Sequence, residues 1–179
     1  MVPPAIAIPG YLTQSKLAQA LQQLVPDGWL GDEVAVAGTR HRWDMAYRRA
    51  GEITVVEYDG DEHYRNSIKI KSDRSKDEDA CGLGYRVIRF PYWVQLDKTT
   101  LYHFFGLEAE IEQSFPHGFI TTKLFPASFC ELGIEGFRIE LFGLPAPVRD
   151  AVISSLQGRA AEHRLPFVLP STLISILVK

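Results

Sequence analysis

The chain has 179 residues, 46% of them hydrophobic and 23% charged, which is ordinary composition for a globular protein with one well-buried core. A net charge of −3 excludes attraction of nucleic acid by overall charge. No apolar run approaches the roughly 20 residues of a membrane helix, and the proline-broken N-terminus lacks the basic start of a signal peptide. We therefore expect a cytoplasmic protein in which Cys81 and Cys130, which match no CxxC pattern, are buried thiols.

The first half of the chain predicts a helix followed by a small mixed sheet. The expected elements are a helix over 14–25, a short strand over 33–37, a hairpin over 42–58, a helix over 72–83 and a strand over 85–90. Ser72 serves as the expected N-cap of the second helix, and Gly84 ends it. Because that helix connects the hairpin to the last strand, Val56 and Val87 are expected on parallel, neighbouring strands.

The second half predicts helices and carries no chemical motif. Apolar spacing predicts helices over 97–112, 129–142 and 148–163, followed by an apolar tail. We therefore expect an α/β core over residues 1–96 and a mainly helical extension over 97–179. The extension would serve as a cap, a homodimer contact or a surface for a partner protein.

Acidic residues crowd the end of the hairpin, in the stretch VVEYDGDEHYR at 55–65. Glu57 and Asp59 share one face of a strand, and the hairpin can bring Asp44 beside them. Three unpaired carboxylates at a half-buried strand end would cost several kcal/mol, which a divalent cation such as Mg²⁺ or Mn²⁺ would offset. The alternative is a set of surface acids paired with arginines such as Arg42 or Arg65.

Basic residues surround this acidic stretch. Of the 19 Lys and Arg residues, 11 lie between Arg40 and Arg89, intermixed with 10 acids. One interpretation is a solvated, salt-bridged surface. The other is an acidic metal site inside a basic rim that contacts phosphates.

Three motifs in order resemble one branch of the PD-(D/E)XK nuclease superfamily, the domains related to the very short patch repair endonucleases. The similarity covers about residues 12–93. Besides Asp44, the segments that carry it are Val56-Glu57-Tyr58-Asp59-Gly60-x-x-His63, Asp73-x-x-Lys76-Asp77 and Gly84-Tyr85-Arg86-Val87-Ile88-Arg89-Phe90. The resemblance implies a restriction-endonuclease-like mixed sheet flanked by helices, and a metal-dependent endonuclease that hydrolyses DNA.

The resemblance also implies roles for individual residues. The catalytic set is Asp44, Glu57, Asp59, His63 and Lys76, and Mg²⁺ or Mn²⁺ would be held by Asp44, Glu57, Asp59 and the Tyr58 carbonyl. His63 would orient the attacking water or stabilise the leaving oxygen. The residues expected to contact DNA phosphates are Arg42, Arg65, Lys69, Lys71 and Arg89.

Two departures from the superfamily pattern leave a second function open. The lysine usual two residues after the acid is replaced by Asp59, so the positive charge must come from Lys69, Lys71, Lys76 or the metal. The early helix offers Gln14 and no acid. The alternative is therefore a catalytically inactive nuclease-fold module that binds DNA or another protein.

Overall fold

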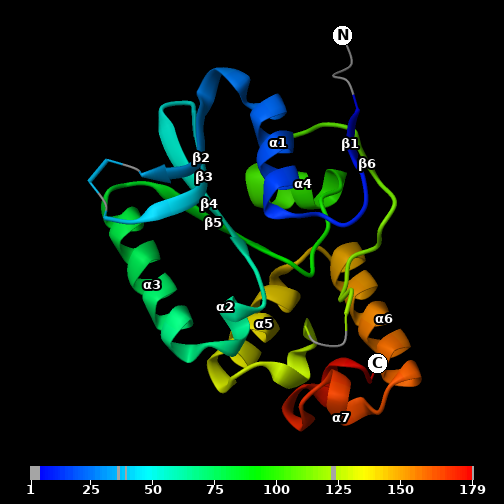
Figure 1. Cartoon of the computed structure of the whole chain (residues 1–179). Helices are drawn as coiled ribbons and strands as arrows, with labels where there is room; N and C mark the ends of the chain where they lie inside the picture. Colours follow the sequence, from blue (N-terminus) through cyan, green and yellow to red (C-terminus); the bar gives the residue numbers. More distant parts are fainter. Residues whose placement is uncertain (1–4, 36, 39, 122–123, 179) are drawn as a thin grey trace.

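The fold is mixed α/β, built on a four-stranded sheet with the strand order β2-β3-β4-β5 (Figure 1). The computed structural model describes residues 5–35, 37–38, 40–121 and 124–178. The strands are β2 Trp29–Ala35, β3 Arg42–Arg49, β4 Glu52–Asp59 and β5 Arg86–Pro91. β2, β3 and β4 are antiparallel neighbours, and β5 lies parallel to β4. The predicted hairpin and parallel crossover are thus present, and β2 begins earlier than expected.

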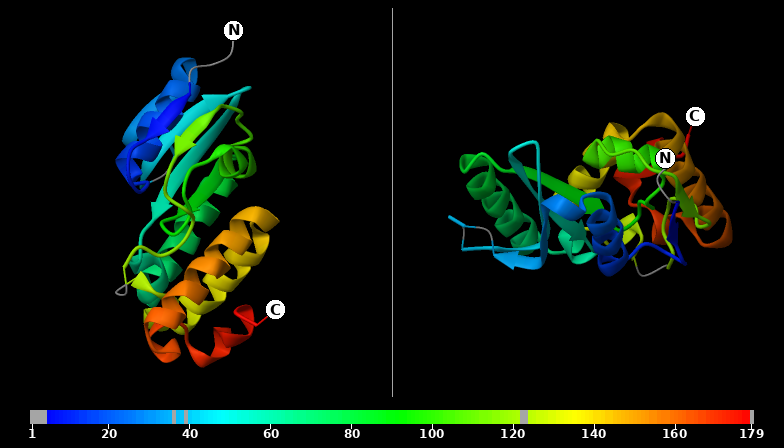
Figure 2. Two further views of the ribbon diagram at one scale, coloured as in Figure 1. Left: turned by 90° about the vertical axis from the view of Figure 1, so that its right-hand side faces the viewer. Right: turned by 90° about the horizontal axis from the view of Figure 1, so that it is seen from above.

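Two helices cover opposite faces of this sheet (Figures 1 and 2). Helix α1 (Gln14–Leu24) packs with the face of β4 that carries Val56, and α3 (Ser67–Gly82) packs with the face that carries Val55. Because side chains alternate along a strand, Glu57 and Asp59 lie on the α3 side. The sheet therefore places the acidic end of β4 next to the polar face of α3.

Helix α3 begins five residues earlier than the sequence predicts. Its N-cap is Asn66, whose side chain accepts hydrogen bonds from the backbone of Ile68 and Lys69 at 3.0 and 3.2 Å. Ser72 consequently lies inside the helix, and the prediction that it caps the helix is wrong. An asparagine side chain satisfies the free N–H groups of a first helical turn as well as a serine does.

The predicted helix over 97–112 is also too long. Helix α4 spans Lys98–Phe105 and ends at Gly106, whose φ of +61° is a left-handed conformation. Downstream, β6 (Ile111–Gln113) pairs in parallel with β1 (Ile6–Ile8), which the sequence did not predict. Three-residue strands are too short to show a clear alternation.

The remaining elements are helical. They are α2 Glu62–Arg65, α5 Glu131–Gly143, α6 Ala146–Glu162, α7 Leu165–Val168 and the 3-10 turns Pro26–Gly28, Pro126–Ser128 and Ser171–Ile176. Helix α5 contacts both α2 and α3. One hydrophobic cluster joins residues from both halves of the chain, including Leu21, Phe90, Phe137 and Val152.

Several side chains differ from their expected exposure. Cys81 is exposed and Cys130 half-buried, so the prediction of two buried thiols is wrong. Trp43 and Trp93, by contrast, are fully buried in the core. No helix in the described part of the chain is long and apolar enough to cross a membrane. Val36, inside the predicted strand 33–37, lies outside the described residues.

Candidate active site

Asp44 and Glu57 meet where β3 and β4 stop pairing. The last backbone partners at this end of the ladder are Met45 and Val56. Beyond them, side chains replace the ladder: the Asp44 N–H donates to Glu57 Oε1 at 3.2 Å, and the Tyr58 N–H donates to Asp44 Oδ2 at 2.8 Å. Each carboxylate therefore bonds the opposite strand.

Lys76 of α3 completes this group, which we call the Asp44 cluster (Asp44, Glu57 and Lys76). Its Nζ lies 2.6 Å from Glu57 Oε1 and 4.3 Å from the centroid of the Trp43 ring. The side chains of Lys76 and Glu57 are only 13% and 5% exposed. A lysine from α3 thus supplies positive charge beside Glu57, although none stands two residues after it in the sequence.

Of the two carboxylates in the cluster, Glu57 is paired with a cation and Asp44 is less well compensated. No cationic side chain lies within ion-pair distance of Asp44 in the described ranges of the chain. Burial and the nearby Glu57 raise the pKa of Asp44, while the Tyr58 N–H and Lys76 act in the opposite direction. Asp44 also lines a surface cavity beside Gln14, Asp32 and Glu33. Its carboxylate is therefore open to a ligand from the α1 side.

A second group, the Arg89 cluster, consists of Arg89 with Asp59, His63, Asp73 and Asp77. The guanidinium donates Nε and Nη2 to the two oxygens of Asp77 at 2.8 Å each, and Nη1 to Asp59 Oδ1 at 2.7 Å. Such charge-assisted, bidentate bonds are the strong ones in proteins. Arg89 therefore ties the end of β4 to α3.

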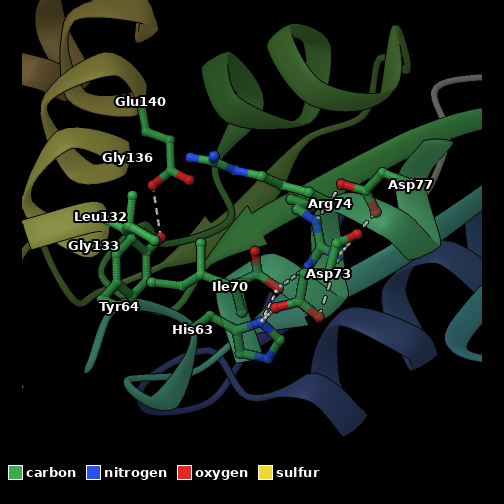
Figure 3. A pocket seen from close by; sticks show the side chains of 12 residues that line it. His63, Tyr64, Ile70, Asp73, Arg74, Asp77, Leu132, Gly133, Gly136 and Glu140 are labelled. Carbon is green, nitrogen blue, oxygen red and sulfur yellow. Dashed lines mark hydrogen bonds and ion pairs between the residues drawn. The ribbon is translucent and has the colours of Figure 1, made fainter. Parts of the chain in front are cut away.

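His63 is held through one ring nitrogen. Its Nδ1 lies 2.7 Å from Asp73 Oδ2, toward which His63 points in Figure 3, and 3.1 Å from Asp59 Oδ1. No described residue forms a hydrogen bond or an ion pair with Nε2. A histidine fixed at Nδ1 by carboxylates can accept or donate a proton at Nε2.

The two aspartates that hold His63 differ in acidity. Burial raises the pKa of Asp59 to about 6, although Arg89 and His63 oppose the shift. Burial also acts to raise the pKa of Asp73, but the His63 hydrogen bond and the charges of Arg89 and Lys69 outweigh it, so that this pKa is lowered. Asp73 is thus the firmly ionised partner of His63.

The predicted convergence of three carboxylates occurs only in part. Asp44 and Glu57 come together, whereas Asp59 belongs to the Arg89 cluster. Glu57 and Asp59 each contact a cation, Lys76 and Arg89 respectively, so the expectation that they are unpaired is wrong. Within the described residues, no group of three or more His, Cys, Asp or Glu side chains could hold a metal ion. Asp44 and Glu57 lie close together, and each accepts a hydrogen bond from the backbone of the opposite strand.

The residues expected to contact phosphates have varied surroundings. Arg42 donates to the Glu33 carbonyl, Arg65 pairs with Asp61 at 3.0 Å, and Lys69 pairs with Asp73 at 3.4 Å. Lys71 is exposed. Arg89 is occupied by Asp59 and Asp77, so its contacts are those of a structural anchor. Asp73 and Lys76, one turn apart on α3, do not pair with each other, because Lys76 contacts Glu57 and Asp73 contacts His63.

Glu140 and Tyr64 are site residues that the sequence did not indicate. Both line a cavity of about 140 Å³ that His63, Asp59 and Arg89 also line. The Tyr64 hydroxyl donates to Glu140 Oε2 at 2.6 Å (Figure 3). No motif marks Glu140, since it lies on α5, far along the chain from His63.

Comparison with known proteins gives no relative for this chain. No protein family, no curated protein and no solved structure matches it. Any assignment of function therefore rests on the contacts within the chain and on the resemblance of its three motifs.

Proposed function

We propose that the protein is a metal-dependent endonuclease that hydrolyses DNA phosphodiester bonds. The observation that carries the proposal is Asp44, a partly buried carboxylate that no cation among the described residues contacts, placed beside Glu57 and Lys76 where two strands separate. Perturbed carboxylates in a cavity are candidates for catalytic groups. A restriction-endonuclease-like core is part of the proposal, and the order α1, three antiparallel strands, α3 and a parallel strand supports it.

In this proposal Asp44 and Glu57 hold Mg²⁺ or Mn²⁺, next to the Tyr58 carbonyl. Mg²⁺ is commonly bound through one or two carboxylates and several waters, so this pair of ligands suffices. The metal would lower the pKa of a bound water and offset charge on the phosphate. The Asp44→Asn variant below tests the first of these ligands.

Lys76 and His63 have different roles in the proposed reaction. Lys76 keeps Glu57 in place and provides positive charge near the phosphate, which replaces the lysine that the sequence motif lacks. His63 transfers a proton through Nε2, because Asp59 and Asp73 hold its Nδ1. Asp59 thus orients His63 in this proposal and is not one of the proposed metal ligands.

A second candidate function is binding of DNA without cleavage. Lys76 already neutralises Glu57 at 2.6 Å, and Gln14 stands where an early acid is expected. In that case exposed basic residues such as Lys71 and Arg74 would contact phosphates, and affinity would fall steeply with salt.

Plasmid relaxation separates the two functions. We would compare wild type with Asp44→Asn and Lys76→Met in Mg²⁺, in Mn²⁺ and in a chelator, with Glu62→Gln as the matched control because Glu62 is exposed on the adjacent helix. We expect metal-dependent nicking, a loss of at least about 100-fold in both cluster variants, and no change in Glu62→Gln. Salt-dependent binding without metal-dependent cleavage would instead establish the second function.

A further inference from the structure

The short helix α2, which carries His63, is held from outside by α5. It spans only Glu62–Arg65, and its N-cap Asp61 makes no side-chain capping bond. An isolated turn of this length is not stable by itself. Tyr64 is its one buried residue, only 2% exposed, so the position of α2 depends on what Tyr64 contacts.

Helix α5 and the residue before it hold the backbone of Tyr64. The Cys130 N–H donates to the Tyr64 carbonyl at 3.0 Å. Gly133 packs so closely that a Cβ there would lie 1.8 Å from the same carbonyl oxygen. Only a glycine permits this approach, so the absence of a side chain at Gly133 allows α5 to lie directly against the backbone of α2.

The side chain of Tyr64 is held as well. Its ring stacks on Phe129 at 4.8 Å between centroids and meets the edge of Tyr92 at 5.9 Å. Its hydroxyl donates to Glu140 Oε2 at 2.6 Å. The hydroxyl bond joins α2 to Glu140, near the C-terminal end of α5. Residues after 125 therefore contact both the ring of Tyr64, through Phe129, and its hydroxyl, through Glu140.

Glu140 faces the same cavity as His63 (Figure 3). The other charged groups that line the cavity are Asp59 from β4, Arg89 from β5, and Asp73, Arg74 and Asp77 from α3. Burial raises the pKa of Glu140 to about 7. Figure 3 shows Glu140 pointing toward Tyr64, while His63 points toward Asp73.

We propose that Glu140 is a positioning residue for His63: by accepting the Tyr64 hydroxyl bond it fixes α2 and so aims the His63 imidazole at Asp59 and Asp73. The C-terminal helices are then part of the site rather than a separate cap. The importance of this positioning for cleavage rests on the proposed function, whereas the positioning itself does not.

Three variants separate positioning from general stability. Tyr64→Phe and Glu140→Leu both break the hydroxyl bond, whereas Glu140→Gln keeps an acceptor oxygen for it. NMR spectra of the imidazole nitrogens report the surroundings of His63 whether or not the protein cleaves DNA, and His63→Asn identifies its signals. We expect Tyr64→Phe and Glu140→Leu to shift or broaden the His63 signals, and Glu140→Gln to leave them as in wild type.

A pair of glycines on α5 gives a second, independent test. Gly133→Ala forces α5 away from Tyr64, whereas a Cβ at Gly136 meets no atom within 4 Å. We expect Gly133→Ala to change the His63 signals in a protein that still gives dispersed spectra, and Gly136→Ala to leave them unchanged. His63 signals that stay unchanged in Tyr64→Phe, Glu140→Leu and Gly133→Ala would overturn the proposal.

Cleavage assays distinguish the two proposals. If the protein is a nuclease, Glu140→Leu should lower kcat by about 10- to 100-fold with little change in KM. The separate variant Glu140→Gln should keep the kcat of wild type. Cleavage that is insensitive to both changes would overturn the role of this positioning in cleavage and leave the nuclease proposal standing. Absence of cleavage in wild type together with altered His63 signals would overturn the nuclease proposal alone.

Discussion

The Asp44 and Arg89 clusters lie at the same end of β4 and differ in how their charges are matched. In the Arg89 cluster each carboxylate contacts a cation: Asp59 and Asp77 contact Arg89, and Asp73 contacts Lys69 at 3.4 Å and Arg89 at 3.6 Å. In the Asp44 cluster two carboxylates have Lys76 alone, which contacts Glu57. Complete pairing indicates a structural joint, and incomplete pairing indicates a place for a ligand.

The type of cation explains the difference. A guanidinium offers five N–H donors in a rigid fork, so Arg89 can serve Asp59 and Asp77 at once. An ammonium is a point charge without a fork of donors, and Lys76 contacts a single carboxylate, that of Glu57. Three predictions follow, from the largest expected effect to the smallest; the first and third test this contrast, and the second concerns Glu140, which lines the cavity beside the Arg89 cluster.

Removal of Arg89 should produce the largest loss of stability. Arg89→Leu would leave Asp59 and Asp77 without their cation, and Arg89 is only 19% exposed. We expect a loss of about 3 kcal/mol in the free energy of unfolding, because breaking a buried pair leaves uncompensated charge. Urea denaturation at pH 7 measures it. Lys71→Met, on the exposed side of α3, is the control and should change stability by less than about 0.5 kcal/mol.

Glu140 should make stability depend on pH near neutrality. Burial raises the pKa of Glu140 from 4.5 to about 7 in the folded protein. A raised pKa means that the folded protein holds this proton more tightly than the unfolded chain does. The contribution of this group to the free energy of unfolding is therefore fully present below pH 4.5 and is lost as pH rises through 7.

Glu140→Gln should remove that dependence. Between pH 5 and 8 we expect wild type to lose about 2 kcal/mol more stability than the variant, measured by urea denaturation. Glu135→Gln, an exposed position on the same helix, should follow wild type. If the free energy of unfolding changed with pH in the same way in wild type and Glu140→Gln, the pKa of Glu140 in the folded protein would not be raised.

Neutralising one aspartate in each cluster should have opposite effects. At pH 7 Asp73→Asn loses charge-assisted bonds to His63 and should cost about 1 kcal/mol, in accord with the lowered pKa of Asp73. Asp44→Asn keeps an oxygen for the Tyr58 N–H and removes a disfavoured charge, so it should stabilise the protein by about 0.5 kcal/mol. Thermal unfolding compares them. Destabilisation by Asp44→Asn would contradict the assignment of Asp44 as a residue kept for function.

Local patterns predicted the part of the fold in which alternation is clear. The hairpin from Arg42 to Asp59 and the parallel strand at Arg86–Pro91 follow from β-branched runs and turn residues. The start of α3 did not follow, because Ile68-Lys69-Ile70-Lys71 alternates as a strand would while Asn66 caps a helix. Helical spacing continued past Gly106, where the backbone ends α4.

The site was predictable to the extent that it depends on strand register. The sequence predicted Asp44 beside Glu57 or Asp59, and the hairpin brings it to Glu57, one residue beyond the last backbone pair. The partners of Asp59 and Lys76 depend on how α3 lies across the sheet, and no pattern along the chain reports that. Glu140 reaches the cavity only through the packing of α5 on α2, so its role required the tertiary structure.

The pairing of β1 with β6 has a consequence for how the chain folds. Ile6 and Ile111 are neighbours in space, so the ladder closes a loop of about 100 residues and loses much chain entropy when it forms. Contacts between distant residues form late when local contacts can form first. We therefore expect β1 and β6 to join after the β3–β4 hairpin, and their amide hydrogens to exchange with solvent sooner than those of β4.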